Sequence, residues 1–358
     1  MNQPPNKMSQ RIFRIAVLGG GAIGREHIKS FQKHPAARVV ALAETSPERG
    51  HEVADEFAIP DVQRDYRTLL RRPDIDVVSI ALPNHLHAPV ALAALRAGKH
   101  VMLDKPMATS AGAAARLVAE AKRHRRLFMV GQNQRFTPEV QTLRRLVESG
   151  RLGEVYHARA IWVRRSGIPR IGSWFTQRKL AGGGCTYDIG VHVLDQTLYL
   201  LGEFEAVSVS GQTYAKFGPH GRANGAWGHS EIDPRLPFDV EDFSIALIRL
   251  KSGRTVLLES AWAAHLPVRD LNGTQLFGTE AGATTNPLRL FRPGRRHYLV
   301  ETPALRRPSA SPDRMVHFLN VLLGREPPHV LPAESLAVQK ILDAIYRSAA
   351  TGREVRVR

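Results

Sequence analysis

A short apolar segment followed by closely spaced glycines constrains the fold of this chain more than any other feature. Residues 15–18 read Ile-Ala-Val-Leu, as in a buried parallel strand, and residues 19–24 read Gly-Gly-Gly-Ala-Ile-Gly. The glycines fit the pattern G-x-G-x-x-G, and a stretch compatible with a helix follows over residues 25–32. A strand, a glycine turn and a helix in this order predict the first crossover of a parallel α/β sheet.

The glycines of this turn would have separate roles in a dinucleotide site. Gly19 permits the tight turn, Gly21 lets the backbone approach a diphosphate, and Gly24 lets helix and strand pack closely. The diphosphate would then bind to the free N–H groups at the start of the helix, which include those of Ala22 and Ile23. We therefore interpret the segment as a dinucleotide site and not as a structural glycine turn of an unrelated domain.

An acid follows the glycine turn at the distance that such a site requires. Glu44 ends the apolar run of residues 39–43 and lies twenty residues beyond Gly24, where its carboxylate can reach the hydroxyls of an adenosine ribose. A carboxylate there would repel a 2′-phosphate, so we expect NAD as the cofactor. Thr45, Ser46 and Arg49 leave NADP open, because they could bind a phosphate if Glu44 turned away.

Strands and helices alternate through the first third of the chain. Further strands are predicted at residues 76–82, 100–103 and 127–131, and helices at residues 47–57, 87–97 and 110–123. This pattern predicts a doubly wound parallel sheet with helices on both faces, over residues 11–131. Ligands bind such sheets at the carboxyl ends of the strands, which is where the glycine turn and Glu44 would lie.

From residue 132 to residue 358 the pattern changes to that of a second α/β domain. Its expected helices cover residues 138–149, 187–201 and 333–350, and residues 218–237 resemble a surface loop. Strands are predicted at residues 155–163, 206–212, 243–250, 255–262, 274–278 and 297–301. A large, mostly antiparallel open sheet is the natural interpretation of these strands.

Two segments place reactive side chains beside expected ligand sites. Lys105 follows the strand at residues 100–103 and precedes a proline, so a cation is held at the ligand edge of the first sheet. Residues 182–184 are three glycines, which would allow close approach of a ligand, and the helix that they open contains Asp188 and His192. A spacing of four residues projects these two side chains from one face of that helix.

With these motifs the chain resembles the Gfo/Idh/MocA family of nicotinamide-dependent oxidoreductases over nearly its entire length. The family's fold is a Rossmann domain followed by an α/β domain with a large open sheet. By this resemblance, Lys105, Asp188 and His192 match the family's catalytic lysine, aspartate and histidine. The resemblance also implies cofactor contacts, in addition to the glycine turn and Glu44, from Pro83, Asn84, His87, Asp104 and Lys105.

The chain departs from the family pattern at two positions. Asp104 stands where the family usually has a glutamate, so the carboxylate is one methylene shorter. Trp174 is followed by Phe175, whereas many members have arginine after this tryptophan. As substrate contacts we expect Trp174, Arg135 and Arg164; Arg164 or its neighbour Arg165 would favour an anionic sugar if either met the ligand.

The resemblance and the motifs together predict an NAD(P)-dependent dehydrogenase that oxidises a secondary hydroxyl of a sugar, cyclitol or related polyol. His192 would take the hydroxyl proton, Lys105 would stabilise the developing alkoxide, and Asp188 would orient one of them. Two alternatives stay open, namely an NAD-dependent glycoside hydrolase of the same fold and a non-catalytic dinucleotide-binding protein.

Composition limits the partners and the compartment. The net charge of +17 would suit nucleic acid, but the basic residues are scattered and no nucleic-acid module accompanies them, so no such partner is expected. The one cysteine, Cys185, and the polar residues 1–10 favour the cytoplasm, and no apolar run is long enough to span a membrane. No metal site is expected. One face of the open sheet must be covered or polar, and the family resemblance implies that a homodimer or homotetramer covers it.

Overall fold

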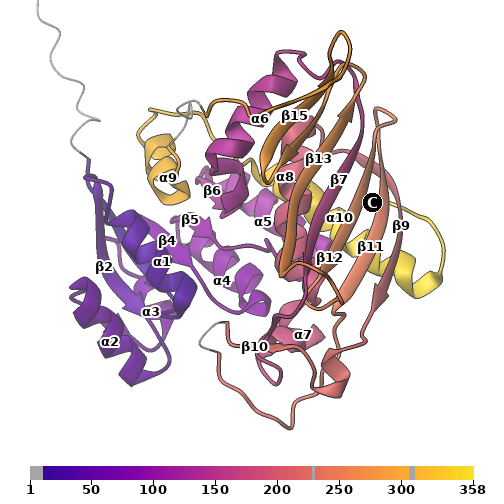
Figure 1. Ribbon diagram of the computed structural model, residues 1–358. Helices are drawn as coiled ribbons and strands as arrows, with labels where there is room; N and C mark the ends of the chain where they lie inside the picture. The colour runs from indigo at the N-terminus through magenta and orange to yellow at the C-terminus, as the bar shows by residue number, and fades with distance from the viewer. Residues whose placement is uncertain (1–10, 228–229, 306–310) are drawn as a thin grey trace, which may run out of the picture. The chain divides into compact units, whose positions relative to one another are not determined.

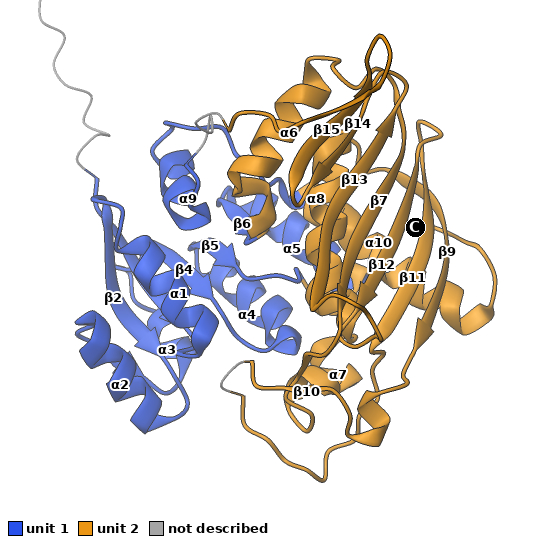
Figure 2. Cartoon of the chain, in the orientation of Figure 1, with its two compact units in different colours: residues 1–107, 112–131, 310–332 blue, residues 108–111, 132–309, 333–358 orange. Residues whose placement is uncertain are grey.

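The computed structural model describes residues 11–227, 230–305 and 311–358 of the chain. They form two compact units (Figures 1 and 2). Of the described residues, unit 1 contains those within 1–107, 112–131 and 310–332, and unit 2 contains those within 108–111, 132–309 and 333–358. The polar residues 1–10 lie outside the described part, so the expectation placed on them has no structural counterpart here.

Unit 1 is built on a parallel sheet of six strands in the order β3-β2-β1-β4-β5-β6. Its strands are β1 (Phe13–Leu18), β2 (Ala37–Ala43), β3 (Val62–Gln63), β4 (Val77–Ile80), β5 (His100–Leu103) and β6 (Phe128–Val130). The strands are continuous apolar runs because both faces are covered: Ile15, Val17 and Leu18 have no exposed surface. This order is that of the doubly wound dinucleotide-binding fold, as the sequence predicts.

The helices of unit 1 follow the strands in the expected alternation. They are α1 (Ala22–Phe31), α2 (Pro47–Phe57), α3 (Tyr66–Leu70), α4 (Asn84–Arg96), α5 (Ala111–His124) and α9 (Arg314–Leu322). Helix α9 groups with unit 1, whereas the sequence analysis includes its residues in the second domain, residues 132–358. It groups with unit 1 because Asp313, at its start, accepts hydrogen bonds from Ser30 and Lys33, and Arg314 pairs with Glu26 at 3.1 Å.

Unit 2 contains a sheet of nine strands in the order β16-β15-β14-β13-β7-β12-β11-β9-β17. The strands are β7 (Val155–Arg164), β9 (Ala206–Tyr214), β11 (Phe243–Leu250), β12 (Thr255–Ala261), β13 (Asp270–Gly278), β14 (Gly282–Thr285), β15 (Leu288–Pro293), β16 (Tyr298–Glu301) and β17 (Val355–Arg356). Only β7 and β12 pair in parallel; every other neighbouring pair described in this sheet is antiparallel. The predicted open, mostly antiparallel sheet is therefore confirmed.

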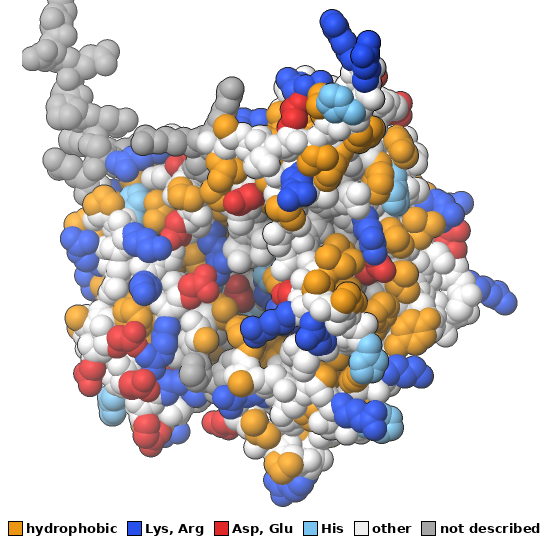
Figure 3. Space-filling model, in the orientation of Figure 1, with side chains coloured by type: hydrophobic (Ala, Val, Ile, Leu, Met, Phe, Trp, Pro, Cys, Tyr) orange, Lys and Arg blue, Asp and Glu red, His pale blue; other side chains and the backbone are white. Residues whose placement is uncertain are grey.

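Helices cover one face of the large sheet and leave the other face open (Figure 1). The covering helices are α6 (Pro138–Glu148), α8 (Val191–Leu201) and α10 (Pro332–Thr351), and a short helix α7 (Arg178–Ala181) lies in the same unit. Buried side chains such as Leu194, Leu258 and Ile345 form the core between helices and strands. On the face seen in Figure 3, hydrophobic side chains gather over the strands, with lysine and arginine side chains dispersed among them.

The structure differs from the sequence prediction in several local features of unit 2. The helix predicted over residues 187–201 begins as a π-helix, Thr186–Gly190, and becomes α8 only at Val191. Strands β14 and β15 are absent from the prediction, because polar residues and Pro287 obscure their alternation. Part of the segment 218–237 is ordered, since β10 (Asn224–Gly225) pairs with β8 (Ile168–Pro169).

Candidate active site

The glycine turn of unit 1 has the geometry that a diphosphate site requires. Gly19 has φ +97°, and a Cβ there would lie 2.3 Å from the carbonyl oxygen of Ala81. A Cβ on Gly24 would lie 1.8 Å from the carbonyl oxygen of Gly19, so this position also excludes a side chain. A Cβ on Gly21 would meet no atom within 4 Å, which leaves open space beside the backbone.

The start of helix α1 fits the same ligand. Gly21 is the N-cap of this helix. No side chain forms a capping hydrogen bond there, and the first turn contains no acidic residue. The first N–H groups of an α-helix, here those of Ala22 and Ile23, have no partner within the helix and lie at the positive end of its dipole. Together with the space beside Gly21, these groups would hold the diphosphate of a dinucleotide.

Glu44 lies at the end of β2, next to the glycine turn. Its Oε2 accepts a hydrogen bond from the N–H of Gly20 at 2.8 Å, and its Oε1 accepts from the N–H of Ser46 at 3.0 Å and from Arg49 at 2.7 Å. Burial opposes ionisation, but the hydrogen bonds from Arg49, Ser46 and Gly20 outweigh it and lower the pKa of Glu44 to about 2. An ionised carboxylate at this place supports a free ribose 2′-hydroxyl and opposes a 2′-phosphate.

The expected residues after β4 and β5 lie at the same edge of this sheet, because β2, β1, β4 and β5 are parallel neighbours. Pro83 is the N-cap of α4, and Asn84 is its first residue. His87 is buried, with its ring nitrogens 2.7 Å from the carbonyl oxygens of Leu82 and Pro106. His87 therefore ties the turn after β4 to the segment that contains Lys105, which supports a positioning role.

Lys105 and Asp104 follow β5 directly and are partly buried. The carboxylate of Asp104 lies 3.9 Å from Nε2 of His27 and 4.0 Å from Arg314. Burial, together with the charge of Arg314, holds the pKa of His27 well below its usual value, so this ring is neutral near pH 7. Asp104, whose side chain is one methylene shorter than the glutamate usual in the family, thus has His27 and Arg314 as polar neighbours within unit 1.

In unit 2, the three glycines precede the helix that contains Asp188 and His192. A Cβ on Gly183 would lie 1.9 Å from the hydroxyl oxygen of Tyr346, and one on Gly184 would lie 1.9 Å from the carbonyl oxygen of Glu241. The sequence predicts that these glycines admit a ligand. At Gly183 and Gly184 the structure instead shows close packing against protein atoms.

The carboxylate of Glu241 fixes this glycine turn. It is buried and accepts hydrogen bonds from the N–H groups of Gly184 (3.0 and 3.1 Å) and Thr186 (2.9 Å) and from the hydroxyl of Tyr346 (2.8 Å). Backbone donors at a helix start are satisfied here by a side chain from another segment. Glu241 therefore determines where the π-helix begins, and with it the place of Asp188.

Two tryptophans contact the expected catalytic side chains. The indole Nε1 of the buried Trp262 donates to Oδ2 of Asp188 at 2.8 Å. The ring of His192 packs against the ring of Trp162, with centroids 5.6 Å apart, and the guanidinium of Arg164 lies 5.3 Å from the Trp162 ring. A π-helix of this kind is frequent at functional sites. Asp188, His192 and Arg164 thus have defined neighbours within unit 2.

The remaining substrate candidates differ in their surroundings. Arg135 is fully buried; Asp195 pairs with it at 2.6 Å, and Glu334 pairs with it as well. These contacts indicate a structural role for Arg135 in place of the expected substrate contact. Trp174 stacks on Phe175 with centroids 3.8 Å apart.

Arg165 and Cys185 lie outside the candidate site, and the structure gives neither of them a role in the chemistry. The guanidinium of Arg165 donates hydrogen bonds to the backbone carbonyl groups of Leu266, Pro267 and Val268. These donors are therefore engaged within the protein and not directed at a substrate. Burial raises the pKa of the Cys185 thiol well above its usual value, which disfavours the nucleophilic thiolate.

Sequence reasoning missed Glu241, Trp262 and Trp162. The acidic pair Glu241-Asp242 directly before an apolar strand is a signal that could have been used, since buried carboxylates need partners. The two tryptophans carry no comparable signal, because an aromatic residue on a strand is usually part of the core. Within residues 11–227, 230–305 and 311–358, no group of His, Cys, Asp and Glu could hold a metal ion, and no helix is long and apolar enough to cross a membrane.

The parallel sheet, its glycine turn and the acid at the end of β2 define a dinucleotide-binding α/β protein. Residues 13–132 match the family described as "Oxidoreductase family, NAD-binding Rossmann fold", and residues 140–284 match the "GFO/IDH/MocA C-terminal domain". The chain belongs to the Gfo/Idh/MocA family. It is an oxidoreductase, and its cofactor is NAD.

Relatives of known name span most of the chain. D-Glucoside 3-dehydrogenase of Escherichia coli (strain K12) is 30% identical over 356 residues, which cover 98% of this chain and 99% of that protein. Levoglucosan dehydrogenase of Pseudarthrobacter phenanthrenivorans is 33% identical over 265 residues, which cover 70% of this chain and 68% of that protein. A solved structure of levoglucosan dehydrogenase in complex with NADH and levoglucosan superposes with a TM-score of 0.84 at 26% identity, covering 97% of this chain and 100% of that one.

Proposed function

We propose that this protein is an NAD-dependent dehydrogenase that oxidises a secondary hydroxyl of a sugar, cyclitol or related polyol. The names of its relatives support a carbohydrate substrate, since both dehydrogenases described above are named for sugar derivatives. The observation that carries the proposal is the setting of Asp188 and His192. One carboxylate and one imidazole lie on the same helix start, and each is held by a tryptophan.

In the proposed reaction, His192 accepts the proton of the substrate hydroxyl. An imidazole suits this step because its ordinary pKa lies near neutrality, so the proton can move in either direction of the reaction. Asp188, oriented by the indole of Trp262, acts as the fixed negative charge that orients His192 or Lys105 and favours a positive charge on it. NAD supplies the hydride acceptor when it is bound.

Lys105 of unit 1 donates a hydrogen bond to the reacting oxygen and stabilises its negative charge as the proton leaves. Pro106 follows Lys105, and the Pro106 carbonyl lies 2.7 Å from the ring of His87, so the backbone beside this ammonium group is held in place. The glycine turn and Glu44 hold the diphosphate and the adenosine ribose. In this proposal the glycine turn and Glu44 bind the cofactor, His192 transfers the proton, and Lys105 stabilises the negative charge.

A single assay separates the dehydrogenase from the two alternative functions. The purified protein is mixed with NAD and a panel of polyols, sugars and glycosides, and NADH absorbance and free sugar are followed together. The proposal predicts net NADH formation with at least one uncharged sugar. Glycoside cleavage without net NADH would instead identify a hydrolase, and the absence of both reactions would indicate a non-catalytic dinucleotide-binding protein.

A further inference from the structure

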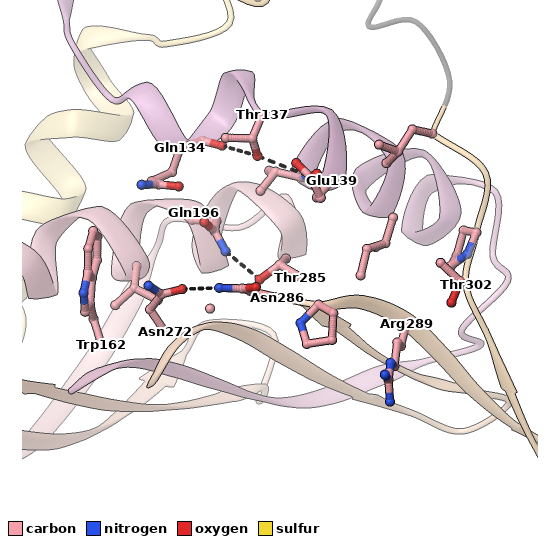
Figure 4. Close-up of a pocket in the computed structure, with 17 residues that line it drawn as sticks. Gln134, Thr137, Glu139, Trp162, Gln196, Asn272, Thr285, Asn286, Arg289 and Thr302 are labelled. Atoms are coloured by element: carbon pink, nitrogen blue, oxygen red, sulfur yellow. Dashed lines mark hydrogen bonds between the residues drawn. The ribbon is translucent and has the colours of Figure 1, made fainter. Parts of the chain in front are cut away.

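Unit 2 contains a pocket of about 630 Å³ whose lining does not include Lys105, Asp188 or His192 (Figure 4). It lies between helices α6 and α8 on one side and strands β13, β14 and β15 on the other. Its volume is within the range of pockets that bind small molecules. Gln134, Gln196, Asn272 and Asn286 contribute four amides to its lining, and Trp162 forms part of its wall.

The lining of this pocket mixes polar and apolar side chains and is nearly uncharged. Besides the four amides it has the hydroxyl groups of three threonines, and among the described lining residues only Glu139 and Arg289 carry charge, one of each sign. Amides and hydroxyls both donate and accept hydrogen bonds, as sugar hydroxyls do. An aromatic ring beside them gives a flat apolar surface for the C–H groups of a pyranose. This chemistry suits an uncharged carbohydrate.

Two sets of contacts hold three of the four amides in place before any ligand binds. Nε2 of Gln196 donates to the hydroxyl oxygens of Thr274 at 3.0 Å and Thr285 at 3.1 Å. Nδ2 of Asn286 donates to Oδ1 of Asn272 at 2.5 Å. Both N–H groups of Gln196 are thereby engaged, and Oε1 is its remaining group toward a ligand hydroxyl. Fixed polar groups of this kind bind a ligand with a smaller entropic cost than mobile ones.

The pocket adjoins the proposed general base. The ring of Trp162, which lines the pocket, also packs on the ring of His192. Gln196 follows His192 by one turn on α8. We propose that this pocket binds an uncharged second sugar residue, linked to the ring that is oxidised next to His192. The inference rests on the proposed dehydrogenase function and makes the preferred substrate a disaccharide or another glycoside with a neutral sugar aglycone.

The first test compares disaccharides with a monosaccharide in the NADH assay. The substrates are methyl β-D-glucoside, cellobiose, maltose, trehalose and an acidic disaccharide with a glucuronic acid unit. For wild-type protein we expect kcat/KM for at least one neutral disaccharide to exceed that for the methyl glucoside by about tenfold, the equivalent of one to two hydrogen bonds. Equal values for all neutral substrates, or a preference for the acidic disaccharide, would overturn the inference.

Matched variants on one strand locate the effect in the pocket. Asn272 and Gln275 both lie on β13, but their odd spacing places them on opposite faces, and only Asn272 lines the pocket. Asn272→Ala should reduce the ratio of the two kcat/KM values by about tenfold. Gln275→Ala should keep the wild-type ratio. A ratio that Asn272→Ala leaves unchanged would contradict the inference.

Calorimetric titration with the same disaccharides distinguishes the two proposals. If no sugar reduces NAD but a disaccharide binds wild-type protein and binds about tenfold more weakly to Asn272→Ala, the pocket assignment stands and the dehydrogenase proposal fails. If sugars reduce NAD but every disaccharide binds both proteins equally, the pocket assignment fails and the dehydrogenase proposal stands.

Discussion

The carboxylate of Glu44 separates two cofactors that differ by one phosphate. Its negative charge opposes a 2′-phosphate, while Arg49, which pairs with it at 2.7 Å, would attract one. Glu44→Ser removes the repulsion and releases the arginine. We expect the ratio of kcat/KM with NAD to kcat/KM with NADP to fall by at least about tenfold. Glu48→Gln, an exposed acid on the next helix, should keep the wild-type ratio; an unchanged ratio in Glu44→Ser would refute this role.

The lowered pKa of Glu44 also links stability to pH. The carboxyl has a pKa of about 2 in the folded chain against an ordinary value of 4.5, so its charge stabilises the fold above pH 4.5. This contribution is lost as the pH falls from 4.5 towards 2. Wild type should therefore exceed Glu44→Gln in free energy of unfolding at pH 7, and the difference should shrink on acidification. Urea denaturation at about pH 7 and at two acidic pH values checks this, and a difference that grows on acidification would contradict it.

His192 and Lys105 act on different atoms in the proposed reaction. His192→Ala removes the general base and should lower kcat by roughly 10²–10⁴-fold. Lys105→Ala should lower kcat strongly as well, because the developing alkoxide loses its hydrogen-bond donor. NAD affinity, measured by fluorescence titration, should survive the His192 change, since the diphosphate and ribose contacts lie in unit 1. Near-normal turnover in His192→Ala would show that another group is the base.

The glycine turn before α8 depends on one buried carboxylate. Glu241→Gln keeps the shape of the side chain but removes the charge that three donors share. We expect the free energy of unfolding to fall by roughly 1.5–3 kcal/mol, and kcat to fall while NAD affinity is kept. Glu259→Gln breaks a partly exposed ion pair with Arg159 and should cost less than about 1 kcal/mol. Equal losses in the two variants would argue against a special role for Glu241.

The sequence predicts those structural elements that depend only on residues close together in the chain. The strand β1, the glycine turn and the acid after β2 could be predicted because glycine conformation and apolar runs are encoded within a few residues. The π-helix at Thr186–Gly190 could not, since it depends on Glu241 and on Trp262, which are distant in the chain. The grouping of helix α9 with unit 1 could not be predicted for the same reason. Its partners Glu26, Ser30 and Lys33 lie on or just after α1, far away in the sequence.

Among the site residues, Asp188 and His192 lie on the helix expected for them, whereas the surroundings of Arg135 depend on distant parts of the chain. Arg135 is expected to contact the substrate because its region is part of the family resemblance. Its surroundings are set by Asp195 and Glu334, which lie on α8 and α10. No local pattern could reveal that a distant carboxylate pairs with this arginine in the core.

The open face of the nine-stranded sheet predicts assembly. Strand alternation places Ile161, Ile245, Leu247, Leu257 and Phe277 on this face, where each remains partly exposed. A second copy of the chain would cover these apolar side chains, so we propose a homodimer or homotetramer. Light scattering at micromolar concentration should give the mass of two or four chains. Leu247→Glu should shift the protein towards monomers, whereas Arg353→Glu should not; a monomeric wild type would contradict the proposal.

Hydride transfer from sugar to nicotinamide is the central claim about the complete molecule, and deuterium tests it most directly. The protein is incubated with NAD and a glycoside in which every carbon-bound hydrogen is deuterium, and the reduced cofactor is analysed by mass spectrometry. Direct transfer predicts that the NADH carries one deuterium atom and that His192→Ala forms it at a rate lower by roughly 10²–10⁴-fold. NADH without deuterium, or a consumed glycoside with no reduced cofactor, would contradict the account.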